Sequence, residues 1–142
     1  MSSEQKGVWI ELAVAIATYV AYAIVVLGEV GRSSWATANY VPFMLGAIGA
    51  SVVVTVIVRT IVAAAGPKDA GKRDVRDRQI YRFGEYASRW GFIAGALIAL
   101  VLAILRVDPF WIANEIYLAF FVSAVSSAVV KLVGYRRGIR AW

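Results

Sequence analysis

Residues 39–65 read NYVPFMLGAIGASVVVTVIVRTIVAAA, an apolar run that contains a single charged residue, Arg59. The apolar side chains are contiguous, so a helix over this stretch is apolar on every side. Such a helix must be buried in protein or in lipid. A chain of 142 residues has no interior large enough to bury several such helices. The stretch therefore predicts a helix that crosses a lipid bilayer, for which about 20 apolar residues are needed.

Three further apolar runs accompany this one, and together they predict an all-α integral membrane protein. Between these runs the connections are short, apart from a polar stretch over 66–88 that we expect to form a cytoplasmic loop. Short connections place neighbouring helices antiparallel. We therefore expect a single membrane domain over 1–142, an antiparallel four-helix bundle with spans at about 7–27, 39–65, 74–106 and 109–133.

Helix start and stop signals mark several of these boundaries. Asn39 stands where an N-cap is expected, and Gly66-Pro67 is typical of a helix stop. Asp108-Pro109 has the pattern of an N-cap followed by proline at the first helical position. These signals predict a tight turn between the third and fourth helices.

The basic residues predict the orientation in the membrane. If the helices alternate in direction, only Arg32 and Arg106 fall on one side. Cytoplasmic loops of membrane proteins carry an excess of lysine and arginine. We therefore expect both termini in the cytoplasm of a prokaryotic cell, with the chain in its inner membrane. The other thirteen basic residues then face the cytoplasm: Lys6, Arg59, Lys68, Lys72, Arg73, Arg76, Arg78, Arg82, Arg89, Lys131, Arg136, Arg137 and Arg140.

The segment before the third apolar run has the pattern of a charged helix. Residues 68–89 read KDAGKRDVRDRQIYRFGEYASR, and an apolar stripe follows the helical period. We therefore expect the third helix to begin near Asp74, inside the cytoplasm, and to continue into the bilayer. The expected i,i+4 ion pairs, each of which stabilises a helix slightly, are Asp69 with Arg73, Arg73 with Asp77, Asp74 with Arg78, and Glu85 with Arg89.

Two interpretations of this segment remain open. It is either a solvated helix whose basic residues anchor it to anionic headgroups, or a docking surface for a protein partner. Aromatic and arginine residues are enriched in interface cores and in the aromatic belts of membrane proteins, so they fit both. The net charge of +6 needs no nucleic-acid partner. The residues concerned are Arg73, Arg76, Arg78, Ile80, Arg82, Phe83, Tyr86, Arg89 and Trp90.

Residues 74–80, DVRDRQI, followed by Gly84 and an apolar helix, carry a resemblance to a known family. The sequence resembles a group of small prokaryotic four-helix membrane proteins that have an Asp-Glu-Arg-Asp-type motif before their third helix. Val75 stands where that motif has glutamate. The resemblance implies the four-helix topology. It implies no reaction, because the group has no assigned activity.

Ionisable residues within the spans are the candidate polar sites, because a charge in a bilayer is costly. Glu115 lies about six residues, or roughly 9 Å of helix, past Pro109. With Asn114 and Tyr117 it can bind a proton or a cation between helices; alternatively, it bonds Asn114 or pairs with Arg32 or Arg106. We expect Glu11 to form an ion pair with Lys6 or Arg59, and we expect Arg59 and Lys131 to act as membrane anchors.

Small residues at spacings of four predict close helix packing. Such positions also allow self-association, since a bundle of four helices leaves apolar faces uncovered. They are Ala13, Ala17 and Ala21 in the first helix, Ala47, Ser51 and Thr55 in the second, Gly91 and Gly95 in the third, and Ser123 and Ser127 in the fourth.

Composition excludes several kinds of chemistry. The chain has no cysteine and no histidine, so it has no thiol nucleophile, imidazole base, or metal or haem site built from these residues. No catalytic motif is present, and we expect neither an enzyme nor a bound cofactor. The prediction is a non-catalytic membrane subunit that associates with itself or with a larger complex, in contact with anionic lipid. The alternative is a small oligomeric transporter or channel for protons or small ions that uses Glu115.

Overall fold

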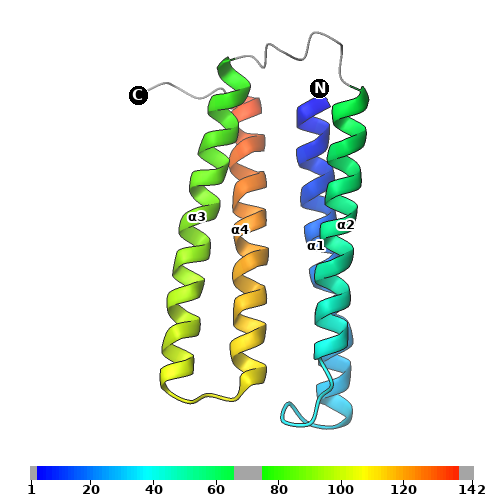
Figure 1. Cartoon of the computed structure of the whole chain (residues 1–142), viewed down its shortest axis with the longest axis vertical. Helices are drawn as coiled ribbons and strands as arrows, with labels where there is room; N and C mark the ends of the chain where they lie inside the picture. The colour runs from blue at the N-terminus through cyan, green and yellow to red at the C-terminus, as the bar shows by residue number, and fades with distance from the viewer. Residues whose placement is uncertain (1–2, 66–74, 138–142) are drawn as a thin grey trace.

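The computed structural model describes residues 3–65 and 75–137, which form four α-helices and two short connections (Figure 1). Each helix is long and apolar enough to cross a membrane. The four predicted spans are therefore confirmed as helices of membrane-spanning length. They are α1 (Ser3–Arg32), α2 (Val41–Ala65), α3 (Val75–Ile104) and α4 (Pro109–Arg137).

Helices α1 and α4 are longer than the sequence predicted. α1 has 30 residues and α4 has 29, so each is about 45 Å long, whereas a hydrocarbon core is about 30 Å thick. The predictions of 7–27 and 109–133 counted only apolar residues, but the polar residues at the ends remain helical. α3 also has 30 residues, so its length does not distinguish it from α1 and α4. Within the polar stretch over 66–88, the residues from Val75 onward are helical, which agrees with the expectation that the third helix begins near Asp74.

Of the predicted helix caps, the one at Asp108 is confirmed and the one at Asn39 is not. Asp108 caps α4 as predicted, because the Phe110 N–H donates to Asp108 Oδ1 over 2.9 Å. The prediction for Asn39 is wrong. α2 begins at Val41, and the Tyr40 carbonyl accepts the first helical bond, from the Met44 N–H over 2.9 Å. The predicted stop at Gly66-Pro67 lies outside the described residues.

α3 ends in a tight left-handed turn at Arg106, whose φ of 56° is the conformation that glycine usually supplies at helix ends. The Arg106 N–H donates to the Ala103 carbonyl and the Val107 N–H to the Leu102 carbonyl, both over 3.0 Å. These two bonds form a Schellman motif, which satisfies carbonyls at the helix end. The chain therefore reverses direction within residues 105–108.

The helix ends gather at two ends of the molecule. We call the end that holds the start of α1, the end of α2, the start of α3 and the end of α4 the terminal end. The opposite end, with connections 33–40 and 105–108, is the hairpin end (Figure 1). Among the described residues, the helices whose backbones lie close together are α1 with α2, α1 with α4, and α3 with α4. The helices therefore form an open row in the order α2, α1, α4, α3, and α4 joins the two hairpins.

The contact between α3 and α4 is the closest in the molecule, and glycines make it possible. A Cβ atom on Gly95 would lie 2.1 Å from the Ala119 Cβ, and one on Gly91 would lie 3.2 Å from the Ser123 Oγ. Both distances are shorter than ordinary van der Waals contact. Ser127 is also buried on this side of α4. Gly91, Gly95, Ser123 and Ser127 therefore pack α3 against α4, as their spacing predicted.

Side chains fill the contact between α1 and α4 at two levels. Near the hairpin end, Tyr22 and Val26 of α1 pack with Phe110 and Tyr117 of α4, and α2 adds Ala47 and Ile48 at the margin. Near the terminal end, Val8 packs with Ala128 and Leu132. The two hairpins are therefore held together by one aromatic and one aliphatic cluster.

Replacing Gly95 with alanine should separate α3 from α4. The added methyl group overlaps Ala119, and overpacking of this kind costs about 1–3 kcal/mol. The free energy of unfolding in detergent micelles should fall by that amount for Gly95→Ala. Gly49→Ala is the matched control, because no atom lies within 4 Å of a Cβ there. Equal stability of the two variants would contradict the close contact.

Candidate functional site

A polar network at the terminal end begins with the ion pair between Glu11 of α1 and Arg59 of α2. Arg59 Nε donates to Glu11 Oε1 over 2.8 Å, so Glu11 has one of its two expected partners. Arg59 Nη1 also donates to the Tyr81 hydroxyl of α3 over 3.5 Å. Because the backbones of α2 and α3 do not approach each other, the Arg59 side chain bridges the space between the two hairpins.

Lys131 of α4 extends the network from the other side. Its side chain is 5% exposed, and its Nζ donates to Glu85 Oε1 of α3 over 3.2 Å. The same ammonium group lies 4.2 Å from the centre of the Tyr81 ring, a cation–π geometry. The stem of Lys131 crosses α3 at Gly84, where a Cβ would lie 2.6 Å from the lysine Cε and Cγ.

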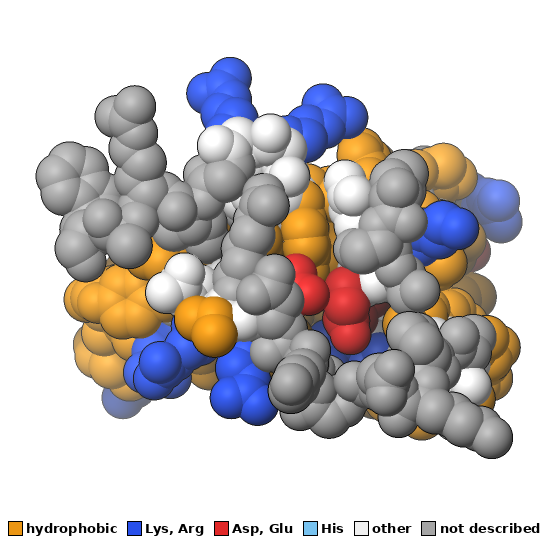
Figure 2. Space-filling model, turned by 90° about the horizontal axis from the view of Figure 1, so that it is seen from above, with side chains coloured by type: hydrophobic (Ala, Val, Ile, Leu, Met, Phe, Trp, Pro, Cys, Tyr) orange, Lys and Arg blue, Asp and Glu red, His pale blue; other side chains and the backbone are white. Residues whose placement is uncertain are grey.

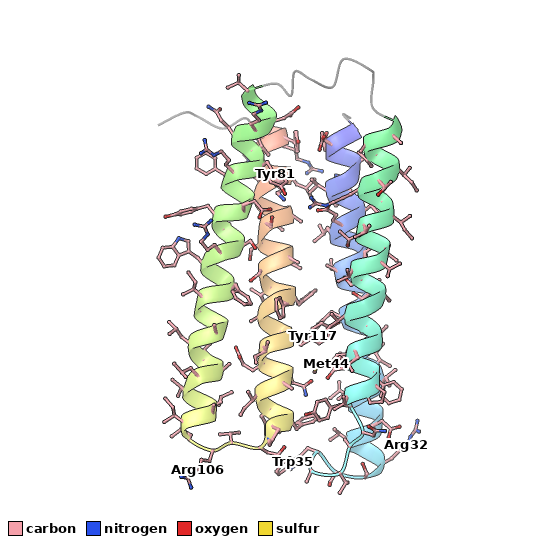
Figure 3. All side chains as sticks on the ribbon, in the orientation of Figure 1. Arg32, Trp35, Met44, Tyr81, Arg106 and Tyr117 are labelled. Carbon is pink, nitrogen blue, oxygen red and sulfur yellow. The ribbon has the colours of Figure 1, made fainter. Side chains whose placement is uncertain are left out.

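The network therefore contains at least one side chain from every helix. Tyr81, labelled in Figure 3, is the centre of the network, because its hydroxyl accepts a hydrogen bond from Arg59 and its ring faces the Lys131 ammonium group. Viewed from this end, acidic side chains lie near the middle of the molecule, with lysine and arginine side chains toward its edge (Figure 2). Two cations and two carboxylates balance one another, so the arrangement joins the helices without leaving an uncompensated charge.

Most of this network was not predicted from the sequence. Arg59 and Lys131 were expected to act as membrane anchors. Glu85 was expected to pair with Arg89, whereas it pairs with Lys131. One sequence feature could have predicted the network. Its charged residues, Glu11, Arg59, Glu85 and Lys131, each lie about two or three turns from the end of the helix that is at the terminal end. The other three predicted i,i+4 pairs involve residues outside the described part.

A second polar contact lies near the hairpin end and joins α1 to α4. The Tyr22 hydroxyl donates to Asn114 Oδ1 over 2.7 Å, and Asn114 Nδ2 donates to the Phe110 carbonyl over 2.8 Å. Tyr22 is buried in the aromatic cluster, so its hydroxyl needs this partner. Nothing in the sequence pattern indicated Tyr22.

Glu115 has none of the partners expected for it. Asn114 is occupied by Tyr22 and Phe110, and Arg32 pairs with Glu29 over 3.5 Å. Glu115 Oε2 is buried with no hydrogen-bond partner. Glu115 Oε1 lies 3.4 Å from a Cβ placed on Gly95, so the carboxyl group is on the side of α4 that faces α3. The explanation of Glu115 as a paired surface carboxylate is therefore wrong.

The predicted polar site of Glu115, Asn114 and Tyr117 is divided between different faces of α4. Asn114 and Tyr117 face α1, where Tyr117 packs edge-on against Tyr22 with ring centroids 4.8 Å apart. Glu115 faces α3 together with Ser123, whose hydroxyl is likewise buried and has no hydrogen-bond partner. Adjacent helical residues differ in direction by about 100°, because a turn holds 3.6 residues.

The predicted docking residues of α3 are exposed, with one exception. Ile80 is 0% exposed, the most deeply buried large side chain described, so it belongs to the contact with α4 and not to the surface. Tyr86 and Trp90 pack together with ring centroids 6.3 Å apart. Arg73 and the side chain of Arg76 lie outside the described part. The exposed residues are Arg78, Arg82, Phe83, Tyr86, Arg89 and Trp90.

The alanine stripe of α1 is not used within the chain. Ala13, Ala17 and Ala21 are exposed, so the prediction that they pack helices of the same chain is wrong. The contacting face of α1 instead carries larger residues such as Tyr22 and Val26. In α2, Ala47, Ser51 and Thr55 are partly buried.

Among the residues the structure describes, no group of three or more acidic side chains gathers in a way that could hold a metal ion. The chain matches no protein-family model, no curated protein and no solved structure. Its function is therefore inferred from the arrangement of its own residues.

Glu85→Gln should destabilise the protein more than Lys131→Met. The first leaves a buried ammonium group without its carboxylate, at a cost of about 1–3 kcal/mol, while the second removes the charge and keeps an apolar stem across Gly84. Unfolding in detergent micelles measures both. The double variant should be about as stable as Lys131→Met alone. A double variant that is the least stable of the three would contradict this account.

Proposed function

We propose that the chain is a non-catalytic subunit of a prokaryotic inner membrane, with both termini in the cytoplasm and its four helices antiparallel. The sequence supports this orientation, because thirteen basic residues belong to the expected cytoplasmic side. Arg32 and Arg106, the other two, lie at the hairpin end (Figure 3). Membership of the four-helix family remains a proposal that rests on residues 74–80.

The observation that carries the proposal is the exposed alanine face of α1. Ala13, Ala17 and Ala21 leave a shallow strip along the helix that no helix of the same chain covers. Small residues at this spacing let the backbones of two helices approach closely in lipid. The open row of helices leaves this face accessible. We infer that a helix of a second copy, or of a larger membrane complex, packs there.

The exposed residues of α3 offer a second contact region at the terminal end. Phe83, Tyr86 and Trp90 lie among Arg82 and Arg89 on a helix that reaches beyond the length of an apolar span. This composition suits the aromatic belt and anionic headgroups of the cytoplasmic leaflet, or the surface of a cytoplasmic partner. It supports the anchoring role that the proposal includes.

Ala17→Leu should prevent association by filling the shallow strip. After extraction in mild detergent, the wild-type chain should elute with one or more further membrane chains, which native mass spectrometry identifies. The substitution should shift at least half of the protein to the monomer. Ala94→Leu, at an exposed alanine of α3, is the matched control and should elute as wild type. A monomeric wild-type chain, or equal profiles for both variants, would refute the proposal.

Glu115 supports a second candidate function, the transport of protons or small ions. Its Oε2 is buried without a partner on the side of α4 that faces α3, about two turns from the hairpin end of that helix. A carboxyl group in this position can take up and release a proton, or hold a cation, if a path to it exists in an oligomer. The specific observation in favour is therefore the unpaired oxygen itself.

Glu115→Gln separates the two functions. If the chain conducts protons, flux into proteoliposomes with an internal pH dye should fall at least tenfold, while the elution profile stays that of wild type. Asn114→Asp is not a suitable control because Asn114 supports Tyr22, so Glu29→Gln at the partly exposed hairpin end serves instead. Wild-type liposomes with no flux above empty ones would exclude the transport function.

A further inference from the structure

An apolar groove lies between α1, α2 and α4 at the middle of their length. It has a volume of about 300 Å³, which is at the small end of ligand-binding cavities. Tyr117, labelled in Figure 3, extends from α4 toward the α1–α2 pair at this level. Lining residues include Ala15, Thr18 and Tyr19 of α1, Ser51 of α2, and Phe121 and Ala124 of α4.

The groove exists because each of the three helices presents a small side chain at the same level. Ala15, Ser51 and Ala124 leave space that larger residues would fill. The aromatic cluster around Tyr22 lies on its hairpin side, and the cluster around Val8 lies on its terminal side. The groove is therefore a gap between two well-packed levels of the same helix junction.

The lining suits hydrocarbon and not a polar ligand. Tyr19 stacks on Phe121 with ring centroids 4.2 Å apart, which forms a flat apolar wall. The Thr18 hydroxyl is occupied, since it donates to the Val14 carbonyl over 2.8 Å. Most of the remaining lining is aliphatic or aromatic, which suits a linear chain of methylene groups.

The groove opens sideways, because α2 and α4 flank α1 without packing against each other. Val52 on one side and Phe120 on the other are both more than half exposed. In a protein whose helices span a bilayer, an opening at this depth faces the interior of the membrane. Molecules that reach it must come from the lipid phase.

The terminal end supplies a partner for a headgroup. Arg59 lies two turns beyond Ser51 on α2, and its side chain is 52% exposed. A guanidinium group has five N–H donors, and among the described residues two of them are used, on Glu11 and Tyr81. The remaining donors are available to a phosphate group, which arginine binds well.

We propose that the groove holds an acyl chain of one anionic phospholipid, whose headgroup lies at Arg59. The lipid comes from the leaflet at the terminal end, and its chain occupies the space between the two hairpins. It would complete the packing that the small residues leave open. This role is independent of association through the alanine face of α1, since the groove and that face lie on different sides of α1.

The test is a photoreactive phosphatidylglycerol that carries a diazirine in its acyl chain, incorporated into vesicles with the full-length protein. Irradiation followed by peptide mapping should place labels on the segments around Ala15, Ser51 and Phe121. Ala124→Phe should reduce labelling of these segments at least fivefold by filling the groove. Ala94→Phe, the same change at an exposed alanine of α3, should leave labelling unchanged.

Two further measurements make the outcome decisive. Phospholipid that co-purifies with the wild-type chain should amount to about one per chain, and Arg59→Gln should lower its anionic fraction. Circular dichroism and elution volume show whether Ala124→Phe is folded, and Ser51→Phe replaces it if it is not. Uniform labelling of all four helices, or labelling of Ala124→Phe equal to wild type, would overturn the proposal. Cross-links to a second copy through the groove would also overturn it.

Discussion

The close approach of α3 to α4 is the contact on which the rest of the arrangement depends. It requires Gly95 opposite Ala119, because any side chain there would occupy the position of the alanine methyl group. Once the two backbones are this close, Lys131 can lie across Gly84 and reach Glu85, and Glu115 is enclosed against α3. In lipid no hydrophobic force draws apolar helices together, so packing and hydrogen bonds of this kind must hold them.

The contact between α1 and α4, which joins the two hairpins, differs from the contact between α3 and α4. Between α1 and α4 the contacts come from large aromatic and aliphatic side chains at two levels, with a groove between them. Polar contacts reinforce each level: Tyr22 with Asn114 near one end, and Arg59 with Tyr81 near the other. The first half of the molecule is thus attached to the second half by fewer and longer side chains than those that hold α3 to α4.

The sequence predicted the helices well and their partners poorly, for a physical reason. Apolar runs and an Asp-Pro cap are local signals, so four helices of membrane-spanning length and the start of α4 were confirmed. Which face of a helix is buried depends on its neighbours. Ala17 and Gly95 both belong to small residues spaced by four, yet Ala17 is exposed and Gly95 is buried. Ile80 and Phe83 belong to the same apolar stripe of α3, yet Ile80 is buried and Phe83 is exposed. Glu115 is a similar case, because its isolation follows from Asn114 facing another helix.

The position of α4 in the row has a consequence for synthesis. Of the four described helices, α4 is synthesised after the other three, and yet α1, which is synthesised before them, packs against it. Until α4 has been inserted, Tyr22 lacks Asn114, and α3 lacks the helix that receives its glycines. The α1–α2 hairpin therefore lacks these contacts until α4 has been synthesised. The contact that completes the arrangement therefore joins α1 to α4, the two described helices that are farthest apart in the sequence.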